Sequence, residues 1–202
     1  MRGRFITLEG IDGAGKSSHV EWLAARLRAA GHNLVVTREP GGTPLGEKLR
    51  ELILHERMDL RTETLLVFAA RQEHLAQVIV PGLEAGKWVL SDRFTDATFA
   101  YQGVGRGLGS ERVAVLEQWV QQGLQPDLTV YFDVPAAVGQ ARRRAAGTGL
   151  DKFEREEESF HMRVREGYLA RAVADPARFR VLDGTKPLDE VRKELELLFA
   201  SI

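Results

Sequence analysis

The 202-residue sequence contains no cysteine, so it has no disulfide bond, no thiolate metal ligand and no cysteine nucleophile. It also lacks long hydrophobic runs, because its apolar stretches fall short of the roughly 20 residues that span a bilayer. The first residues, MRGRFITLEG, turn acidic after a short apolar run and do not resemble a signal peptide. We therefore expect a soluble, cytoplasmic protein with no membrane partner.

Neither sign of charge is in excess: the net charge is −1. Without a strong positive field, the protein is not expected to bind nucleic acid or anionic lipid. Hydrophobic residues make up 44% of the chain, enough for a packed core at this length. The histidines show no paired spacing typical of a metal site or a catalytic triad, so we interpret all five as structural. They are His19, His32, His55, His74 and His161.

Short apolar runs rich in β-formers alternate with longer stretches of helical periodicity. Strands are predicted near 4–9, 34–38, 87–92, 128–133 and 179–183, and helices near 16–30, 44–56, 62–85, 111–124, 135–146, 153–173 and 187–200. The strands lack in–out alternation of polarity, as expected when both faces of a parallel sheet are covered. The sequence therefore predicts a three-layer α/β fold, a five-stranded parallel sheet between helices, in a single domain over 1–202.

Residues 8–18, LEGIDGAGKSS, contain G-x-x-x-x-G-K-S between a predicted strand and a predicted helix. Loop glycines let backbone N–H groups surround phosphate oxygens, and the helix adds the positive end of its dipole. In this motif Lys16 reaches the β- and γ-phosphates and the Ser17 hydroxyl binds Mg²⁺. The predicted nucleotide-binding residues are Gly10, Ile11, Asp12, Gly13, Ala14, Gly15, Lys16 and Ser17. We expect a P-loop NTPase fold that binds ATP or GTP.

Two missing motifs separate phosphoryl transfer from hydrolysis. The sequence lacks the N-K-x-D motif that recognises guanine in GTPases. The nearest string, TKPLD, has Thr185 in place of asparagine. The third strand ends VLSDRF, so Arg93 follows Asp92 where a motor ATPase would place a water-polarising glutamate. Arginine cannot activate water, but it can hold a second phosphate group. The pattern favours a kinase over a nucleotide-dependent switch, the alternative from another class.

Five segments, in order, resemble bacterial thymidylate kinases of the P-loop nucleoside monophosphate kinase family. They are DGAGKSS (12–18), TREPGGT (37–43), FAARQEH (68–74), DRFTDATFAYQG (92–103) and FHMRVREGYLARA (160–172). The resemblance covers essentially the whole chain. It implies transfer of the γ-phosphate of ATP to dTMP, giving dTDP for dTTP and DNA synthesis, with Mg²⁺, in a homodimer packed through helices. A kinase for another nucleoside monophosphate or a deoxynucleoside is the alternative.

The residues that the resemblance implies on the phosphate side carry charges. A nucleoside monophosphate is largely a dianion at neutral pH, so its oxygen attacks without a general base. Asp12 would accept a hydrogen bond from the acceptor 3′-hydroxyl, and Glu39 would line the acceptor site. Arg50 and Arg93 would bind the acceptor phosphate, and Asp92 would orient Mg²⁺ through water.

On the base side, the resemblance implies that Arg71 donates to a thymine carbonyl, assisted by Thr98 and Gln102. Tyr101 would fill the space that a ribose 2′-hydroxyl needs, which would explain a deoxy preference. The predicted dTMP-binding residues are Asp12, Glu39, Arg50, Phe68, Arg71, Arg93, Thr98, Tyr101 and Gln102.

The chain departs from the family pattern at two places near the base. The family places an aromatic residue, which stacks on thymine, four positions before the base-reading arginine, and here that position is Val67. Phe68 follows one residue later, and that offset turns a helix face by about 100°. Ala97 stands where the family tends to have serine, next to Thr98, which keeps a hydroxyl. Base recognition is therefore less affected than stacking.

The phosphate loop carries no arginine, unlike the loop of many relatives. The basic, glycine-containing segment RRRAAGTGLDK, residues 142–152, is predicted to be a small lid that supplies the positive charge. Successive helical residues point about 100° apart, so not all three arginines can face the phosphates. Arg142 is the first choice and Lys152 a weaker candidate. The predicted catalytic residues are Lys16, Arg93, Arg142, Arg143 and Arg144.

Overall fold

The computed structural model describes residues 2–146, 153 and 156–200. Within them, five strands form one parallel sheet in the order β2-β3-β1-β4-β5. The strands are β1 (Phe5–Glu9), β2 (Leu34–Arg38), β3 (Trp88–Asp92), β4 (Leu128–Asp133) and β5 (Phe179–Asp183). These bounds lie within one residue of the predicted strands, and the predicted parallel sheet is confirmed.

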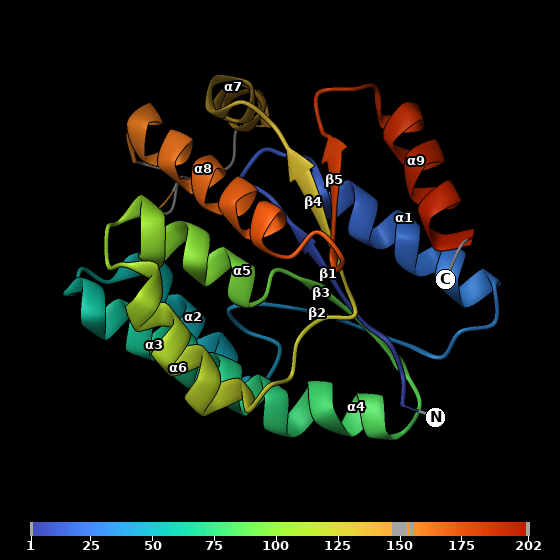
Figure 1. Cartoon of the computed structure of the whole chain (residues 1–202), viewed down its shortest axis with the longest axis horizontal. Helices are drawn as coiled ribbons and strands as arrows, with labels where there is room; N and C mark the ends of the chain where they lie inside the picture. The colour runs from blue at the N-terminus through green and yellow to red at the C-terminus, as the bar shows by residue number, and fades with distance from the viewer. Residues whose placement is uncertain (1, 147–152, 154–155, 201–202) are drawn as a thin grey trace.

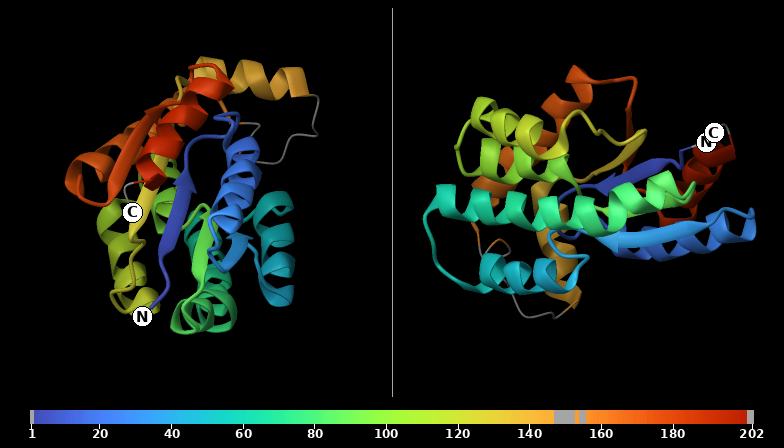
Figure 2. Two further views of the ribbon diagram at one scale, coloured as in Figure 1. Left: turned by 90° about the vertical axis from the view of Figure 1, so that its right-hand side faces the viewer. Right: turned by 90° about the horizontal axis from the view of Figure 1, so that it is seen from below.

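Helices cover both faces of this sheet, which gives the three predicted layers (Figure 1). One layer contains α1 (Lys16–Ala29) and α9 (Leu188–Ala200). The other contains α3 (Leu60–His74), α4 (Val80–Glu84), α5 (Thr95–Thr98), α6 (Ser110–Gln121) and α8 (Glu158–Ala174), with α2 (Pro44–His55) packed on α3. Helix α7 (Ala136–Ala146) lies beyond the carboxyl ends of the strands (Figures 1 and 2). In the described part of the chain, no helix has the length and apolarity to cross a membrane.

The predicted helices are wrong in part. Helix α8 begins at Glu158, not at the predicted residue 153. The helix predicted over 62–85 is a continuous helical run that passes from α3 through a π-helical turn, η1 (Leu75–Ile79), into α4. A helical segment that was not predicted, α5 followed by the π-helical η2 (Phe99–Gly105), comes directly after β3. It packs along α8, where a methyl group on Gly105 would come within 2.7 Å of the Val164 side chain. This segment places the DRFTDATFAYQG motif beside the carboxyl edge of the sheet.

Candidate active site

The phosphate loop connects β1 to α1 and touches α7. Gly13 has a φ of 81°, a left-handed conformation that favours glycine. A methyl group at this position would overlap the carbonyl oxygen of Gly139 in α7, and one on Gly139 would lie 2.8 Å from the carbonyl oxygen of Asp12. The loop and α7 therefore meet backbone to backbone.

Lys16, the first residue of α1, is buried over the loop. Its ammonium donates to the carbonyl oxygens of Gly10 (3.0 Å) and Ile11 (3.1 Å). Burial and the nearby Arg93 charge lower the pKa of Lys16. The ammonium is thus held at the loop that surrounds phosphate oxygens in this motif.

A groove runs along the loop and is lined by Lys16, Ser17, Asp92, Arg142 and Arg143 among others. Among the described residues, Asp92 Oδ1 is buried with no hydrogen-bond partner. Carboxylate oxygens, substrate phosphates and water are typical ligands of Mg²⁺. The unpartnered Asp92 oxygen and the Ser17 hydroxyl in the same groove therefore fit a Mg²⁺ ion held together with a nucleotide.

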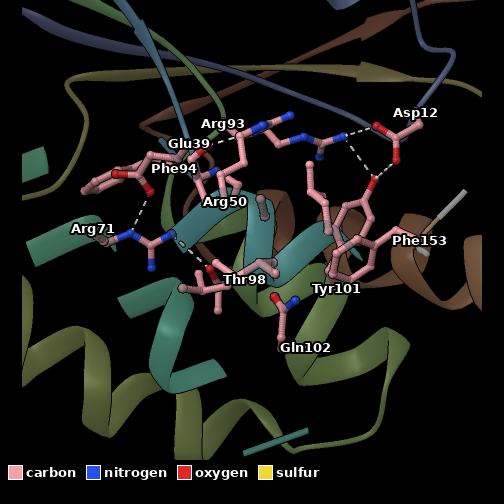
Figure 3. A pocket seen from close by; sticks show the side chains of 15 residues that line it. Asp12, Glu39, Arg50, Arg71, Arg93, Phe94, Thr98, Tyr101, Gln102 and Phe153 are labelled. Atoms are coloured by element: carbon pink, nitrogen blue, oxygen red, sulfur yellow. Dashed lines mark hydrogen bonds and ion pairs between the residues drawn. The ribbon is translucent and has the colours of Figure 1, made fainter. Parts of the chain in front are cut away.

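A second hollow opens beside the groove (Figure 3). We call it the acceptor pocket. It is lined by all of the predicted dTMP-binding residues except Phe68, namely Asp12, Glu39, Arg50, Arg71, Arg93, Thr98, Tyr101 and Gln102.

Arg71 is almost fully buried in this pocket and held from several sides. Its Nε donates to Glu39 Oε2 (2.8 Å) and its Nη2 donates to Thr98 Oγ1 (2.9 Å). The guanidinium lies 4.8 Å from the ring centroid of Phe68 and 5.1 Å from that of Phe94. The remaining nitrogen, Nη1, is buried without a partner among the described residues. Arg71 therefore lines the pocket and keeps one guanidinium nitrogen without a partner among the described residues.

Phe68 does not line the acceptor pocket, contrary to the prediction. The one-residue offset turns its ring into a core cluster with Phe99, Leu108 and Val113, beneath the Arg71 guanidinium. Val67 lines the pocket instead. Two aromatic residues that were not predicted, Phe94 and Phe153, also line it, and the position of Phe94 directly after Arg93 could have revealed it.

Arg93 lies on the boundary between the groove and the pocket, in a left-handed backbone conformation with a φ of 71°. Its guanidinium donates to Asp12 Oδ1 (2.6 Å) and to the hydroxyls of Tyr168 (2.9 Å) and Tyr101 (3.0 Å). Tyr101 in turn donates to Asp12 Oδ2 (3.0 Å). Burial alone would raise the pKa of Asp12, but the charges of Arg93 and Lys16 hold it far below its usual range. Asp12 is therefore ionised.

The groove and the acceptor pocket share four lining residues: Asp12, Glu39, Arg50 and Arg93. Two arginines thus stand where the hollows meet. Arg50 Nη1 donates to the Pro40 carbonyl oxygen (2.8 Å), which holds it at this position. A phosphate on each side would face the same cations, as a transfer between two phosphates requires.

The predicted lid arginines differ in their surroundings. Arg143 is buried: its Nη2 donates to His161 Nε2 (3.3 Å), while Nε and Nη1 have no partner among the described residues. Arg142 donates to the Gly184 carbonyl oxygen (2.8 Å), and Arg144 is exposed on α7. Arg142 and Arg143 both line the groove, and Arg142 stays a candidate. Arg143 joins it because two of its nitrogens have no partner among the described residues. Residues 147–152, with Lys152, lie outside the described residues.

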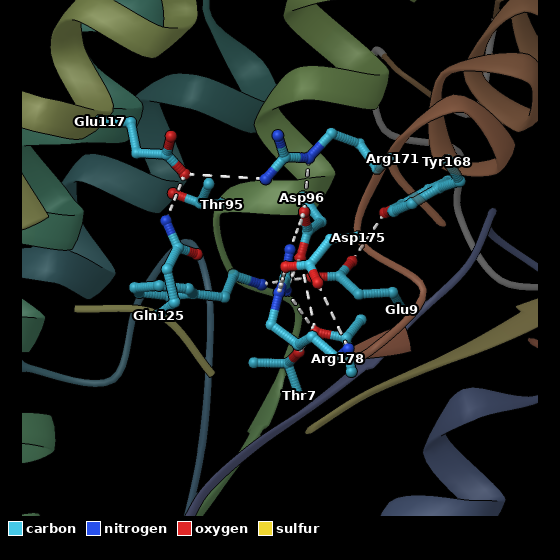
Figure 4. Close-up of polar contacts among 12 residues, drawn as sticks. Thr7, Glu9, Thr95, Asp96, Glu117, Gln125, Tyr168, Arg171, Asp175 and Arg178 are labelled. Atoms are coloured by element: carbon cyan, nitrogen blue, oxygen red, sulfur yellow. Dashed lines mark hydrogen bonds and ion pairs between the residues drawn. The ribbon is translucent and has the colours of Figure 1, made fainter. Parts of the chain in front are cut away.

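A buried polar network that was not predicted includes Glu9, Asp96 and Tyr168 (Figure 4), and Tyr168 contacts Arg93. Glu9, at the end of β1, accepts from the Phe94 backbone N–H (2.7 Å) and from the Tyr168 hydroxyl (2.8 Å). Burial, together with the nearby Asp96 charge, raises the pKa of Glu9 to about 8. Asp96 is itself paired with Arg171 and Arg178. The network therefore ties β1, α5 and α8 to the Arg93 position.

The raised pKa of Glu9 predicts a pH dependence of stability. The pKa rises from 4.5 to about 8 on folding, so between these values the folded protein holds a proton that the unfolded chain has lost. The free energy of unfolding should fall as pH rises across this window, by about 1 kcal/mol per pH unit, and the slope should end above pH 8. Urea unfolding of the wild type and Glu9→Gln at several pH values measures this. Parallel curves for the two proteins would contradict the prediction.

A parallel α/β sheet, a phosphate loop and an arginine-lined junction to a second pocket define a P-loop phosphotransferase. A family model described as "Thymidylate kinase" matches residues 8–195. The chain is 62% identical over 202 residues to a thymidylate kinase of Cupriavidus metallidurans, covering 100% of both chains. It is 64% identical over 195 residues to that of Methylobacillus flagellatus, covering 96% of each. The chain belongs to the thymidylate kinase family.

Proposed function

We propose that the protein transfers the γ-phosphate of ATP to dTMP, giving dTDP and ADP. The observation that carries this proposal is the meeting of two hollows at Asp12, Arg50 and Arg93. The groove with the phosphate loop suits ATP, and the acceptor pocket with Arg71 suits a nucleoside monophosphate. The names of the family and of its relatives supply the identity of the acceptor.

In this mechanism an oxygen of the dTMP phosphate attacks the γ-phosphorus of ATP. The new P–O bond forms as the bond between the γ-phosphorus and the bridging oxygen breaks, and ADP leaves. The acceptor phosphate is already a dianion, so no residue needs to remove a proton. Lys16, Arg93 and Arg143 neutralise the negative charge that spreads between donor and acceptor. Mg²⁺, bound near Ser17 and Asp92, would supply further positive charge to the ATP phosphates.

Base recognition is assigned to the free donor of Arg71. Nη1 would donate to a carbonyl oxygen of thymine, while Thr98 and Gln102 complete the polar side of the pocket. Gln102 Nε2 donates to Glu63 Oε1 (2.9 Å), which holds its side chain in a fixed orientation. Tyr101, held between Arg93 and Asp12, would fill the space of a ribose 2′-hydroxyl.

Arg71→Ala should impair the use of dTMP and spare that of ATP. The variant leaves a pocket polar group unpaired, which costs roughly 1–3 kcal/mol and raises the KM for dTMP by about 5-fold to 150-fold. The KM for ATP should stay nearly unchanged. Steady-state kinetics with each substrate varied in turn measure the two constants, and Arg61→Ala, an exposed arginine on the same helix, is the matched control. Equal increases in both KM values would assign Arg71 a structural role.

A coupled assay of ATP consumption tests the proposed function directly. ADP should appear only when a nucleoside monophosphate is added. The rate of ADP formation should be highest with dTMP in a panel that includes dUMP, dCMP, dGMP and ribothymidine 5′-monophosphate. ATP consumption without any acceptor would contradict the proposal, and a different best acceptor would replace dTMP.

The assembly and location of the enzyme are part of the same proposal. We infer a single kinase domain over 1–202 with the arginine segment as its lid, and a cytoplasmic homodimer. Helices α3 and α6 pack together and expose Leu65, Val115 and Trp119, apolar side chains that a partner subunit would cover. Sedimentation equilibrium, which measures mass in solution, tests the dimer.

A further inference from the structure

A row of hydrogen bonds leads from β2 to Arg71; it is part-buried at Thr37 and buried at His74, Glu39 and Arg71. Thr37 Oγ1 lies 2.6 Å from His74 Nε2, and His74 Nδ1 lies 2.9 Å from Glu39 Oε1. The other Glu39 oxygen accepts from Arg71 Nε (2.8 Å). The row joins β2, the loop that follows it and the last turn of α3. Neither Thr37 nor His74 lines the acceptor pocket or the groove.

The Glu39 carboxylate sets the direction of its bond with His74. An ionised carboxylate only accepts hydrogen bonds, so the hydrogen shared with Glu39 belongs to His74 Nδ1. In a neutral imidazole, Nε2 is then an acceptor and the Thr37 hydroxyl donates to it. Each Glu39 oxygen is therefore held by a different donor, one from His74 and one from Arg71.

The surroundings leave the row little room to rearrange. The His74 side chain is 0% exposed and that of Glu39 is 4% exposed. A methyl group on Gly42 would lie 2.7 Å from His74 Nε2 and 2.7 Å from Thr37 Oγ1, so the loop after β2 closes directly over this pair. The imidazole cannot turn away without displacing that loop.

The orientation of the free Arg71 donor depends on the other two guanidinium contacts. Nε is held by Glu39 and Nη2 by Thr98, and the plane of the group then determines where Nη1 points. We propose that Thr37 and His74 form a positioning relay that fixes Glu39 and, through it, the donor that Arg71 presents to the acceptor base. This inference rests on the proposed function. Thr37 and His74 line neither hollow, so we expect the relay to change acceptor binding through Arg71 and to leave the KM for ATP and kcat nearly unchanged.

Two substitutions at one position separate the hydroxyl from the shape of the side chain. Thr37→Val keeps the volume and removes the donor to His74, whereas Thr37→Ser keeps the hydroxyl. Thr37→Val should raise the KM for dTMP about 5-fold to 10-fold, because a buried imidazole nitrogen loses its partner. Thr37→Ser should match the wild type. For both variants, kcat and the KM for ATP should stay at wild-type values.

The double variant Thr37→Val/Arg71→Ala tests whether the effect passes through Arg71. A relay through Arg71 predicts no further rise in the KM for dTMP beyond that of Arg71→Ala, since coupled residues are non-additive. His74→Phe should raise the KM for dTMP more than Thr37→Val does. If His74→Phe does not fold, the two Thr37 variants alone decide the test. Equal KM values for Thr37→Val and Thr37→Ser, additive effects, or parallel changes in both substrates would overturn the relay. If the wild type itself does not use dTMP, the proposed function fails instead.

Discussion

Lys16→Ala should fold like the wild type and lose most of its activity. Alanine is a good helix former at the first position of α1, so the loop and helix should remain. The substitution removes a charged donor to the transferring phosphoryl group, and the loss of one such donor costs about 100-fold to 1,000-fold in kcat. Rates at saturating ATP and dTMP, with circular dichroism spectra of each protein, measure both expectations.

The matched control is Lys193→Ala, which removes an exposed lysine from α9. Both variants change the net charge equally, so a general electrostatic effect would appear in both. If folded Lys16→Ala kept most of the wild-type rate, the loop would not be the site of transfer.

Arg143→Ala should lower kcat strongly while leaving ATP affinity nearly unchanged. No arginine lies in the phosphate loop, so the charge that develops between donor and acceptor needs a further cation besides Lys16 and Mg²⁺. An arginine supplied from outside the loop is worth on the order of 1,000-fold or more in related phosphoryl transfers. Two Arg143 nitrogens are buried without partners among the described residues, so the group has donors available. Single-turnover rates and ATP titrations measure the two quantities.

Arg144→Ala is the control for this prediction, because Arg144 is exposed on the same helix. Arg144→Ala should keep nearly the wild-type kcat and ATP affinity. Arg143→Lys keeps the charge but cannot bind two oxygens in a fork, so its rate should lie between those of the wild type and Arg143→Ala. Wild-type rates for Arg143→Ala would exclude this arginine from the transfer step.

Most of the sheet could be predicted because its strands are short apolar runs. All five residues of β1 are buried, so polarity along the strand cannot alternate. The helical segment 95–105 was not predicted, because TDATFAYQGVG is short and contains two glycines, which disfavour a helix. Its conformation depends on packing against α8, where Gly105 permits a close approach to Phe160 and Val164. Tertiary contact, which a local pattern does not contain, decides that segment.

The site divides in the same way. Residues that would touch phosphate or base were predicted from motifs, because the ligand chemistry demands particular residue types at fixed spacing. Residues that hold them were missed: Glu9 and Tyr168 are 159 positions apart in the chain and meet only in the fold. His74 was interpreted as structural and proves to contact Glu39 directly. Phe68 was predicted as a site residue because it is aromatic, but its position on the helix turns its ring away from the pocket.

The contact between Gly13 and Gly139 limits how this sequence can vary. A side chain at either glycine would meet main-chain atoms of the other segment, and main chain cannot rotate out of the way as a flexible side chain can. Two positions 126 residues apart (139 − 13) must therefore both lack a side chain for the loop and α7 to meet, although neither carries a functional group. Substitution of either would push the arginine-bearing helix away from the nucleotide loop.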